Sequence, residues 1–118
     1  MMHELAVARE LIGLIEAEML SHGAARLERV VVEYGALAGI MPEALSLAFE
    51  ALLAGGPWAD ARLELACVPL RLKCGACGQC FGGEGREALW QPCPACGEDL
   101  GHEVLAGREL VLKTLVLA

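Results

Sequence analysis

Two short segments of the chain repeat one pattern of cysteine and glycine: residues 74–78 read CGACG and residues 93–97 read CPACG. In each segment two residues separate the cysteines, so a tight turn places both sulfurs on one side. The glycine that follows permits the bend of the backbone. Two such pairs offer four thiolates, which is the ligand set of a tetrahedral Zn²⁺ site. With all four positions filled by protein, the ion would be structural rather than catalytic.

This interpretation assigns zinc to four residues: Cys74, Cys77, Cys93 and Cys96. Two alternatives use the same motif, a rubredoxin-type iron centre and a redox-active dithiol. Redox chemistry is less favoured, because both pairs have the same form and a single metal ion is enough to use them both. The metal would also stabilise about thirty residues that lack an apolar core of their own.

Two cysteines remain outside the repeated pattern. Cys80 follows Cys77 by three residues and could compete as a ligand, but the second pair already completes a set of four. Cys67 lies in an alternating apolar segment, where it is expected to be a small apolar residue on the inner face of a strand. Both are predicted to be free thiols.

The other candidate for chemistry is the amino terminus, which reads MMHEL. A free α-amine, two backbone amide nitrogens and the imidazole of His3 can together surround a metal ion in a plane. Four nitrogens in a square suit Ni²⁺ and Cu²⁺. If translation begins at Met2, the histidine becomes the second residue and the set of terminal nitrogens changes. A simpler explanation is a helix start, where the helix dipole favours Glu4.

The elements that would position these residues follow from the apolar periodicity. Apolar residues recur at helical spacing between Leu5 and Met19, which predicts an amphipathic helix with a buried stripe of Leu5, Ala8, Ile12, Ile15 and Met19. A second helix is predicted from Pro42 to Gly55, with a stripe of Leu45, Phe49, Leu52 and Leu53.

Three strands are predicted in the segments RVVVEYG (29–35), ARLELACVP (61–69) and ELVLKTLVLA (109–118). No helical or strand period persists between residues 73 and 101. The fold class is therefore α+β, a small domain of two helices and a three-stranded sheet with an inserted zinc ribbon. Residues 1–69 and 105–118 would form the first domain, and residues 70–104 the insert. The last strand is expected to pair in the same sheet as the first two.

Composition excludes several functions. The net charge of −7, from 16 acidic and 9 basic residues, argues against nucleic acid, which rewards clustered lysine and arginine. No apolar run approaches the ~20 residues that span a bilayer, and charges near the start exclude a signal peptide. A cytoplasmic location is expected, where six cysteines indicate metal binding rather than disulfides. The acidic ribbon suits a protein partner better than a phosphate backbone.

The whole chain resembles one protein family. MHEL near the start, EYGALAGIMPEALSLAFEAL in the middle, the two CxxCG turns and GRELVLKTLVL at the end occur in a single order. Together they resemble the HypA/HybF family, nickel-incorporation proteins for [NiFe] hydrogenase, some of which also serve urease. The resemblance implies a nickel-binding α/β domain with an inserted zinc domain, a GTPase partner of the HypB type, and delivery of nickel to the hydrogenase large subunit.

By this resemblance His3, preceded by Met2, matches the nickel-binding histidine and Glu4 matches the glutamate after it, while the four CxxC cysteines match the zinc ligands. The chain departs from the family by one additional methionine, so the coordinating amine is that of Met1 or of Met2. The expected nickel site thus comprises His3, Met1, Met2 and Glu4.

Two other functions remain as alternatives. A zinc-ribbon adaptor without a transported metal would bind one zinc ion and ignore the loss of His3. A metalloenzyme is less favoured, because the chain has no H-E-x-x-H helix and no glycine-rich phosphate loop. The protein is therefore expected not to be an enzyme. His22 and His102 are expected to be surface residues, and the apolar last strand would allow a homodimer through its edge.

Overall fold

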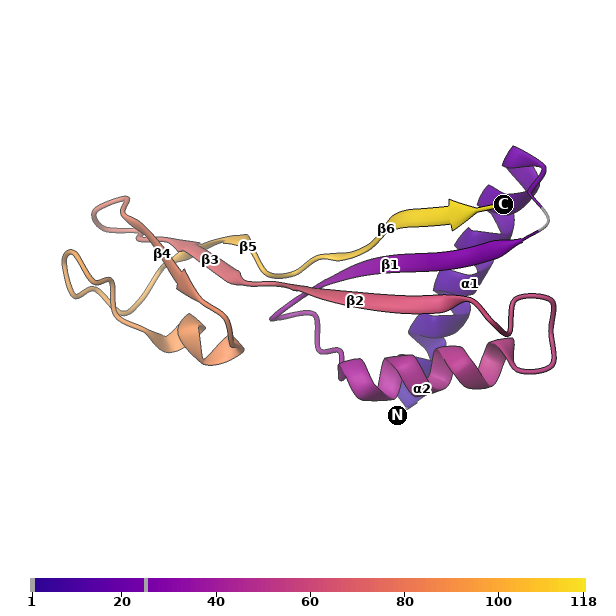
Figure 1. The fold of residues 1–118 in the computed structure, drawn as a ribbon. Helices are drawn as coiled ribbons and strands as arrows, with labels where there is room; N and C mark the ends of the chain where they lie inside the picture. The colour runs from indigo at the N-terminus through magenta and orange to yellow at the C-terminus, as the bar shows by residue number, and fades with distance from the viewer. Residues whose placement is uncertain (1, 25) are drawn as a thin grey trace. The chain divides into compact units, whose positions relative to one another are not determined.

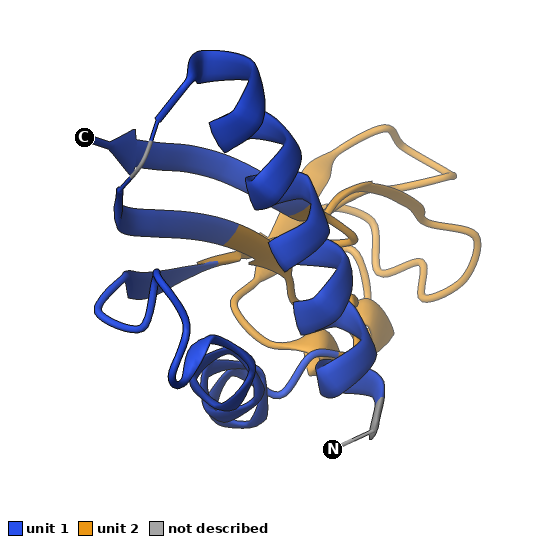
Figure 2. Ribbon diagram, turned by 90° about the vertical axis from the view of Figure 1, so that its right-hand side faces the viewer, with its two compact units in different colours: residues 1–32, 40–66, 111–118 blue, residues 33–39, 67–110 orange. Residues whose placement is uncertain are grey.

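The computed structural model describes residues 2–24 and 26–118, which form two compact units (Figure 2). The first unit takes the residues up to 32 together with 40–66 and 111–118. The second takes residues 33–39 and 67–110. Each unit has its own hydrophobic cluster and its own sheet, so each is described by itself.

The first sheet has the strand order β2-β1-β6, in which β1 is Leu27–Gly35, β2 is Arg62–Val68 and β6 is Leu110–Leu117. Helix α2 connects β1 to β2, and these two strands run in the same direction, whereas β6 runs the opposite way (Figure 1). Arg26 and Ala118 exchange two backbone hydrogen bonds of 3.1 Å at the antiparallel end. The predicted α+β class and the return of the last strand to the sheet of the first two are confirmed, with β6 paired to β1.

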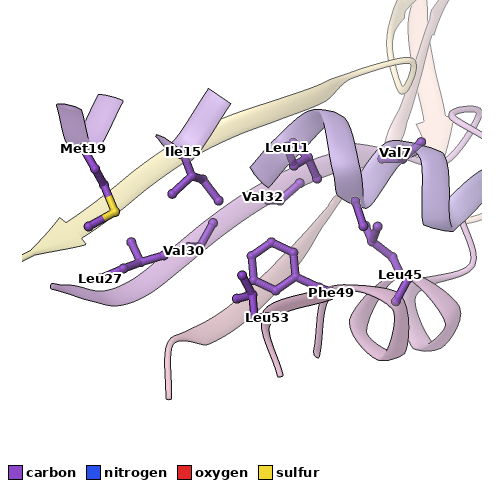
Figure 3. Packing of buried hydrophobic residues seen from close by; sticks show 12 residues of the cluster. Val7, Leu11, Ile15, Met19, Leu27, Val30, Val32, Leu45, Phe49 and Leu53 are labelled. Carbon is purple, nitrogen blue, oxygen red and sulfur yellow. The ribbon is translucent and has the colours of Figure 1, made fainter. Parts of the chain in front are cut away.

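Helix α1 (Met2–His22) packs its apolar face against α2 (Pro42–Leu53) and the sheet (Figure 3). The predicted stripe is slightly rotated: Leu5 and Ile12 are only half-buried, while Val7 and Leu11 are buried. No helix in the described part of the chain is long and apolar enough to cross a bilayer. The fully and nearly buried residues of this core are Val7, Ala8, Leu11, Ile15, Met19, Leu27, Val30, Val32, Leu45, Ala48, Phe49 and Leu53.

Helix α2 begins at Pro42, whose fixed φ and missing N–H suit a first helical position. Its N-cap residue is Met41, which has no side chain able to cap the helix. The helix buries Leu45, Phe49 and Leu53, as predicted. Leu52 is only half-buried, and Ala48 is buried in addition. The first turn of α2 therefore needs a hydrogen-bond acceptor from elsewhere in the fold.

The second unit contains a sheet that the sequence analysis did not predict. Its strand order is β4-β3-β5, with β3 at Leu70–Lys73, β4 at Cys80–Gly83 and β5 at Glu103–Ala106. A short 3₁₀ helix, η1 (Arg86–Trp90), lies between β4 and β5 in the chain. Leu72 lies opposite Phe81 on one side and Val104 on the other. Strands of four residues are too short to show a period in the sequence, which is why none was expected.

The prediction for Cys67 was wrong, because its side chain is exposed. Residues of β2 alternate between exposed and half-buried only as far as Ala66, and then Ala66 and Cys67 are exposed in succession. Leu63 and Leu65 pack against the first core, but Cys67, near the end of β2, is not among the residues that do, so its side chain stays exposed.

The first core provides a direct test of these assignments. Replacing Phe49 with alanine is expected to lower the free energy of unfolding by about 3–5 kcal/mol, because it removes a ring that is 1% exposed and leaves a cavity. Leu47→Ala, on the same helix but 55% exposed, is expected to change it by less than about 0.5 kcal/mol. Urea unfolding of the two variants checks this, and equal losses would contradict the assigned helix face.

Candidate metal centre

The two CxxCG segments fold into equivalent turns. The amide of Gly78 donates to the carbonyl of Cys74 over 3.0 Å, and the amide of Gly97 donates to the carbonyl of Cys93 over 2.8 Å. Both glycines adopt positive φ, +79° for Gly78 and +81° for Gly97, a region that residues with a Cβ rarely occupy. The glycines are therefore required where the repeated motif has them.

These turns bring the four predicted sulfurs into one cluster. Their Sγ atoms all lie within 4.8 Å of one another, with 3.5 Å between Cys74 and Cys96 and 3.6 Å between Cys77 and Cys93. A tetrahedral ion with Zn–S bonds of about 2.3 Å requires sulfurs about 3.8 Å apart. The spacing and the all-sulfur donor set therefore fit a four-coordinate metal ion such as zinc.

Backbone amides point at the buried sulfurs of the cluster. Cys74 Sγ accepts from the amides of Ala76 (3.3 Å) and Cys77 (3.4 Å), and Cys93 Sγ accepts from the amide of Ala95 (3.4 Å). Such N–H groups stabilise thiolates, so the turns offer negative sulfur to a cation. Cys74 and Cys93 are also part of the apolar cluster of the second unit, while Cys77 and Cys96 are exposed.

The same contacts shift the pKa values of three of these thiols in different directions. Hydrogen bonds from the amides of Cys77 and Ala76, together with the neighbouring thiols, lower the pKa of Cys74 to about 6. At Cys96 the amide of Glu98 acts to lower the pKa, but the bond to Cys74, burial and the other two thiols outweigh it and raise the pKa to about 12. The pKa of Cys77 is also raised: the amide of Gln79 lowers it, but Cys93 and burial prevail. Without a cation, four adjacent thiols cannot all ionise.

The other two cysteines lie outside the cluster. Cys80 is exposed and pairs with Lys73 in the register of β3 and β4. Cys67 is exposed at the end of β2. Among the described residues, only the four predicted cysteines form a group of three or more His, Cys, Asp or Glu side chains that could hold a metal ion.

The two remaining histidines differ from each other. His22 is exposed at the end of α1, as expected, with Nδ1 3.0 Å from the carbonyl oxygen of Glu18. His102 was expected on the surface, but it is half-buried with its ring edge-on to Phe81, centroids 4.9 Å apart. Neither ring nitrogen of His102 has a hydrogen-bond partner among the described residues. It belongs to the packing of the second unit.

At the amino terminus the structure places His3 and Glu4 in opposite environments. His3 is exposed in the first turn of α1, whereas Glu4 is 3% exposed. Glu4 Oε2 accepts a hydrogen bond of 3.2 Å from the amide of Met41, the N-cap of α2. Met1 and the side chain of Met2, the other two residues of the predicted nickel site, lie outside what the structure describes.

The role of Met41 was missed in the sequence analysis. A backbone amide gives no signal in the amino-acid pattern, and 37 residues separate it from Glu4. The available clue was indirect: a helix that begins Met-Pro has no side-chain cap of its own. Glu4 supplies the acceptor from α1, at the end of α2 where the helix dipole favours a negative charge.

Comparison with known proteins identifies a family that matches nearly the whole chain. A family described as hydrogenase/urease nickel incorporation, metallochaperone, hypA matches residues 2–117. The hydrogenase maturation factor HypA of Solidesulfovibrio magneticus is 44% identical over 116 residues, 98% of this chain and 99% of that protein. The corresponding protein of Geobacter sulfurreducens is 39% identical over 114 residues, 97% of each chain. The solution structure of the Ni metallochaperone HypA from Helicobacter pylori has a TM-score of 0.65 at 25% identity, covering 97% of this chain and 96% of that one.

The acidities of the cluster predict the number of protons that zinc displaces. At pH 7 Cys74 is mostly a thiolate, whereas Cys77 and Cys96 keep their protons, so zinc binding to metal-free protein is expected to release at least about two protons per ion. Affinity should therefore rise with pH. Calorimetric titration in buffers of different ionisation enthalpy measures this, and release of less than one proton would contradict the thiol acidities.

Proposed function

Because the chain belongs to the HypA family of hydrogenase/urease nickel-incorporation metallochaperones, we propose that it accepts nickel at the segment around His3 and delivers it while its four cysteines hold a structural zinc ion. The family consists of maturation factors rather than enzymes. The observation that carries the proposal is the contrast at the amino terminus: an exposed imidazole beside a carboxylate that is buried and bound.

The proposed zinc site is closed. Cys74, Cys77, Cys93 and Cys96 would occupy all four positions of a tetrahedral ion, which leaves none for water or substrate. Two of these residues are buried within the small core of the second unit. A zinc ion there would stabilise the folded second unit, and its removal would weaken the contacts around the four cysteines.

The proposed nickel site is open. The donors are the terminal amine, which Met1 or Met2 would supply, backbone amide nitrogens and the imidazole of His3, a set whose square arrangement Ni²⁺ favours. Helix α1 begins at Met2, and the first N–H groups of a helix have no partner within it. Nickel can therefore use amides from this turn at little cost in helical hydrogen bonds, and exposure permits transfer by ligand exchange.

Glu4 remains in the proposed site as the residue that fixes the segment in place. Its carboxylate is already bound to the amide of Met41 and is almost fully buried. We therefore assign the nickel donors to the residues before Glu4 and the anchoring to Glu4 itself.

The partners and location follow from the same proposal. A GTPase of the HypB type would cooperate in nickel delivery, and the recipient would be the large subunit of a [NiFe] hydrogenase, or urease. We propose the cytoplasm as the location, because a thiolate metal site and the free thiols of Cys67 and Cys80 persist where thiols are kept reduced.

Nickel titration tests the terminal site. Zinc-loaded protein with its native amino terminus is expected to bind one Ni²⁺ per chain, with the absorption band of a planar nitrogen site. His3→Ala and an added N-terminal tag should each abolish this band and leave the zinc content unchanged.

The matched control is His22→Ala, which removes another exposed histidine of the same helix and should bind nickel like the original protein. Nickel binding that survives both His3→Ala and the tag would place the nickel site elsewhere. Loss of zinc in His3→Ala would mean that the variant acts on the fold instead.

Glu4 variants separate anchoring from nickel coordination. Glu4→Ala is expected to lower the free energy of unfolding by about 1–3 kcal/mol, because the Met41 amide loses its buried acceptor. Glu4→Gln keeps an oxygen acceptor and should lose less, with the nickel absorption band unchanged. Glu10→Ala, an exposed acid on the same helix, is the control. A changed nickel band in Glu4→Gln would show instead that the carboxylate binds the ion.

A further inference from the structure

A groove lies between α2 and the edge strand β2 of the first unit. One part is a cavity of about 360 Å³, lined among others by Phe49 and Leu53 of α2 and by Leu63 of β2. A second cavity of about 480 Å³ is lined by Pro42, Leu47 and Leu65 together with polar residues of α2. Ser46 and Glu50 line both cavities, so the two adjoin along the helix.

The groove follows the length of the helix. It begins at Pro42, the first residue of α2, and reaches Leu53, the last. At a rise of 1.5 Å per residue, these twelve residues span about 18 Å, the length of five or six residues in an extended strand. Figure 1 shows α2 running alongside β2. The groove is therefore long enough for a short strand.

One wall of the groove is the outer edge of the sheet. In the order β2-β1-β6, β2 is an outermost strand, and no other strand in the described part of the chain pairs with its outer side. Backbone N–H and C=O groups on that side are available to another extended segment. Leu63 and Leu65 alternate with exposed residues along β2 and are half-buried. An added strand would find both backbone partners and an apolar surface for alternate side chains.

The charges at the rim select the partner. Glu43 and Glu50 are seven residues apart, two turns of α2, and both are exposed on the side that lines the groove. On β2, the carboxylate of Glu64 is bound by Arg29 at 3.2 Å, and Arg62 is the single cation of the lining. The helix side of the groove is thus acidic, in a chain whose net charge is −7.

We propose that this groove binds an extended basic segment of a partner protein, which adds as a strand to the outer edge of β2. Apolar side chains of the segment would face Leu47, Leu63 and Leu65, and its lysines or arginines would face Glu43 and Glu50. A second copy of this chain is a poor occupant, because it carries the same charge of −7 and would be repelled.

The groove also ends beside the amino-terminal segment. Pro42 follows Met41, whose amide holds the carboxylate of Glu4, and His3 precedes Glu4. A partner strand that reaches Pro42 would come close to the proposed nickel donors. In this respect the inference builds on the proposed function, but binding of the strand itself requires no nickel.

The test uses zinc-loaded, nickel-free protein and a fluorescent eight-residue peptide, Val-Thr-Lys-Thr-Val-Thr-Lys-Thr, whose valines and lysines share one face of an extended strand. Fluorescence anisotropy measures the affinity, and backbone amide NMR shifts locate the peptide. We expect the shifts to centre on residues 42–50 and 62–66. A peptide with glutamate in place of lysine should not bind measurably. Because nickel is absent, failure here would leave the nickel-binding proposal untouched.

Two charge reversals on exposed helical glutamates form a matched pair. Glu50→Lys should weaken binding of the lysine peptide about fivefold, because it replaces a local attraction with a repulsion. Glu10→Lys changes the net charge equally, but Glu10 lines neither cavity, so screening should limit its effect to less than about twofold. Equal effects of the two variants would reduce the binding to overall charge and overturn the proposal.

Other outcomes also overturn it. Equal binding of the glutamate peptide would exclude charge selection, and shifts outside α2 and β2 would exclude the groove. If the same amides shift as protein concentration rises without peptide, and sedimentation shows a doubled mass, then a second copy occupies the groove instead of a basic partner strand.

Discussion

The structure of the second unit depends on four thiol sulfurs that lie within 4.8 Å of one another. The residues of its small core include Cys74 and Cys93, so the metal centre and the hydrophobic centre are one structure. Acidity alone cannot stabilise this arrangement: Cys74 ionises readily, with a pKa near 6, while the pKa of Cys96 rises to about 12. A divalent cation is the simplest means of keeping all four sulfurs negative and close together.

The first unit depends on a different balance. Its buried core is aliphatic apart from Phe49, and two helices pack against the sheet. The exception is Glu4, a buried acid in the first turn of α1. Its carboxylate satisfies the amide of Met41, where α2 begins with no side-chain cap, and lies where the dipole of α2 favours negative charge. A single contact therefore caps the start of α2 and fixes the first turn of α1.

These two solutions suit the two metals of the proposed function. A closed set of four thiolates retains its ion, whereas an exposed imidazole at a chain terminus can release one by ligand exchange. By the Irving–Williams order, such nitrogen donors bind Cu²⁺ more tightly than Ni²⁺, so affinity alone cannot select nickel. Selection must come from metal supply and from docking to the right protein. The acidic groove along α2, which ends beside Met41, provides a surface on which docking could be specific.

Much of this could be read from the sequence, because the relevant signals are local. The CxxCG turns depend on residues within five positions, and helical periodicity identified Ala8, Ile15, Met19, Phe49 and Leu53 as buried. Spacing likewise predicted the α+β class and the return of the last strand to the first sheet. The second sheet escaped prediction because its strands have only four residues. The exposure of Cys67, the burial of His102 against Phe81 and the bond from Met41 to Glu4 were decided by tertiary structure alone. Each depends on which backbone or side chain arrives from a distant part of the chain, and no periodicity within a single element encodes that meeting.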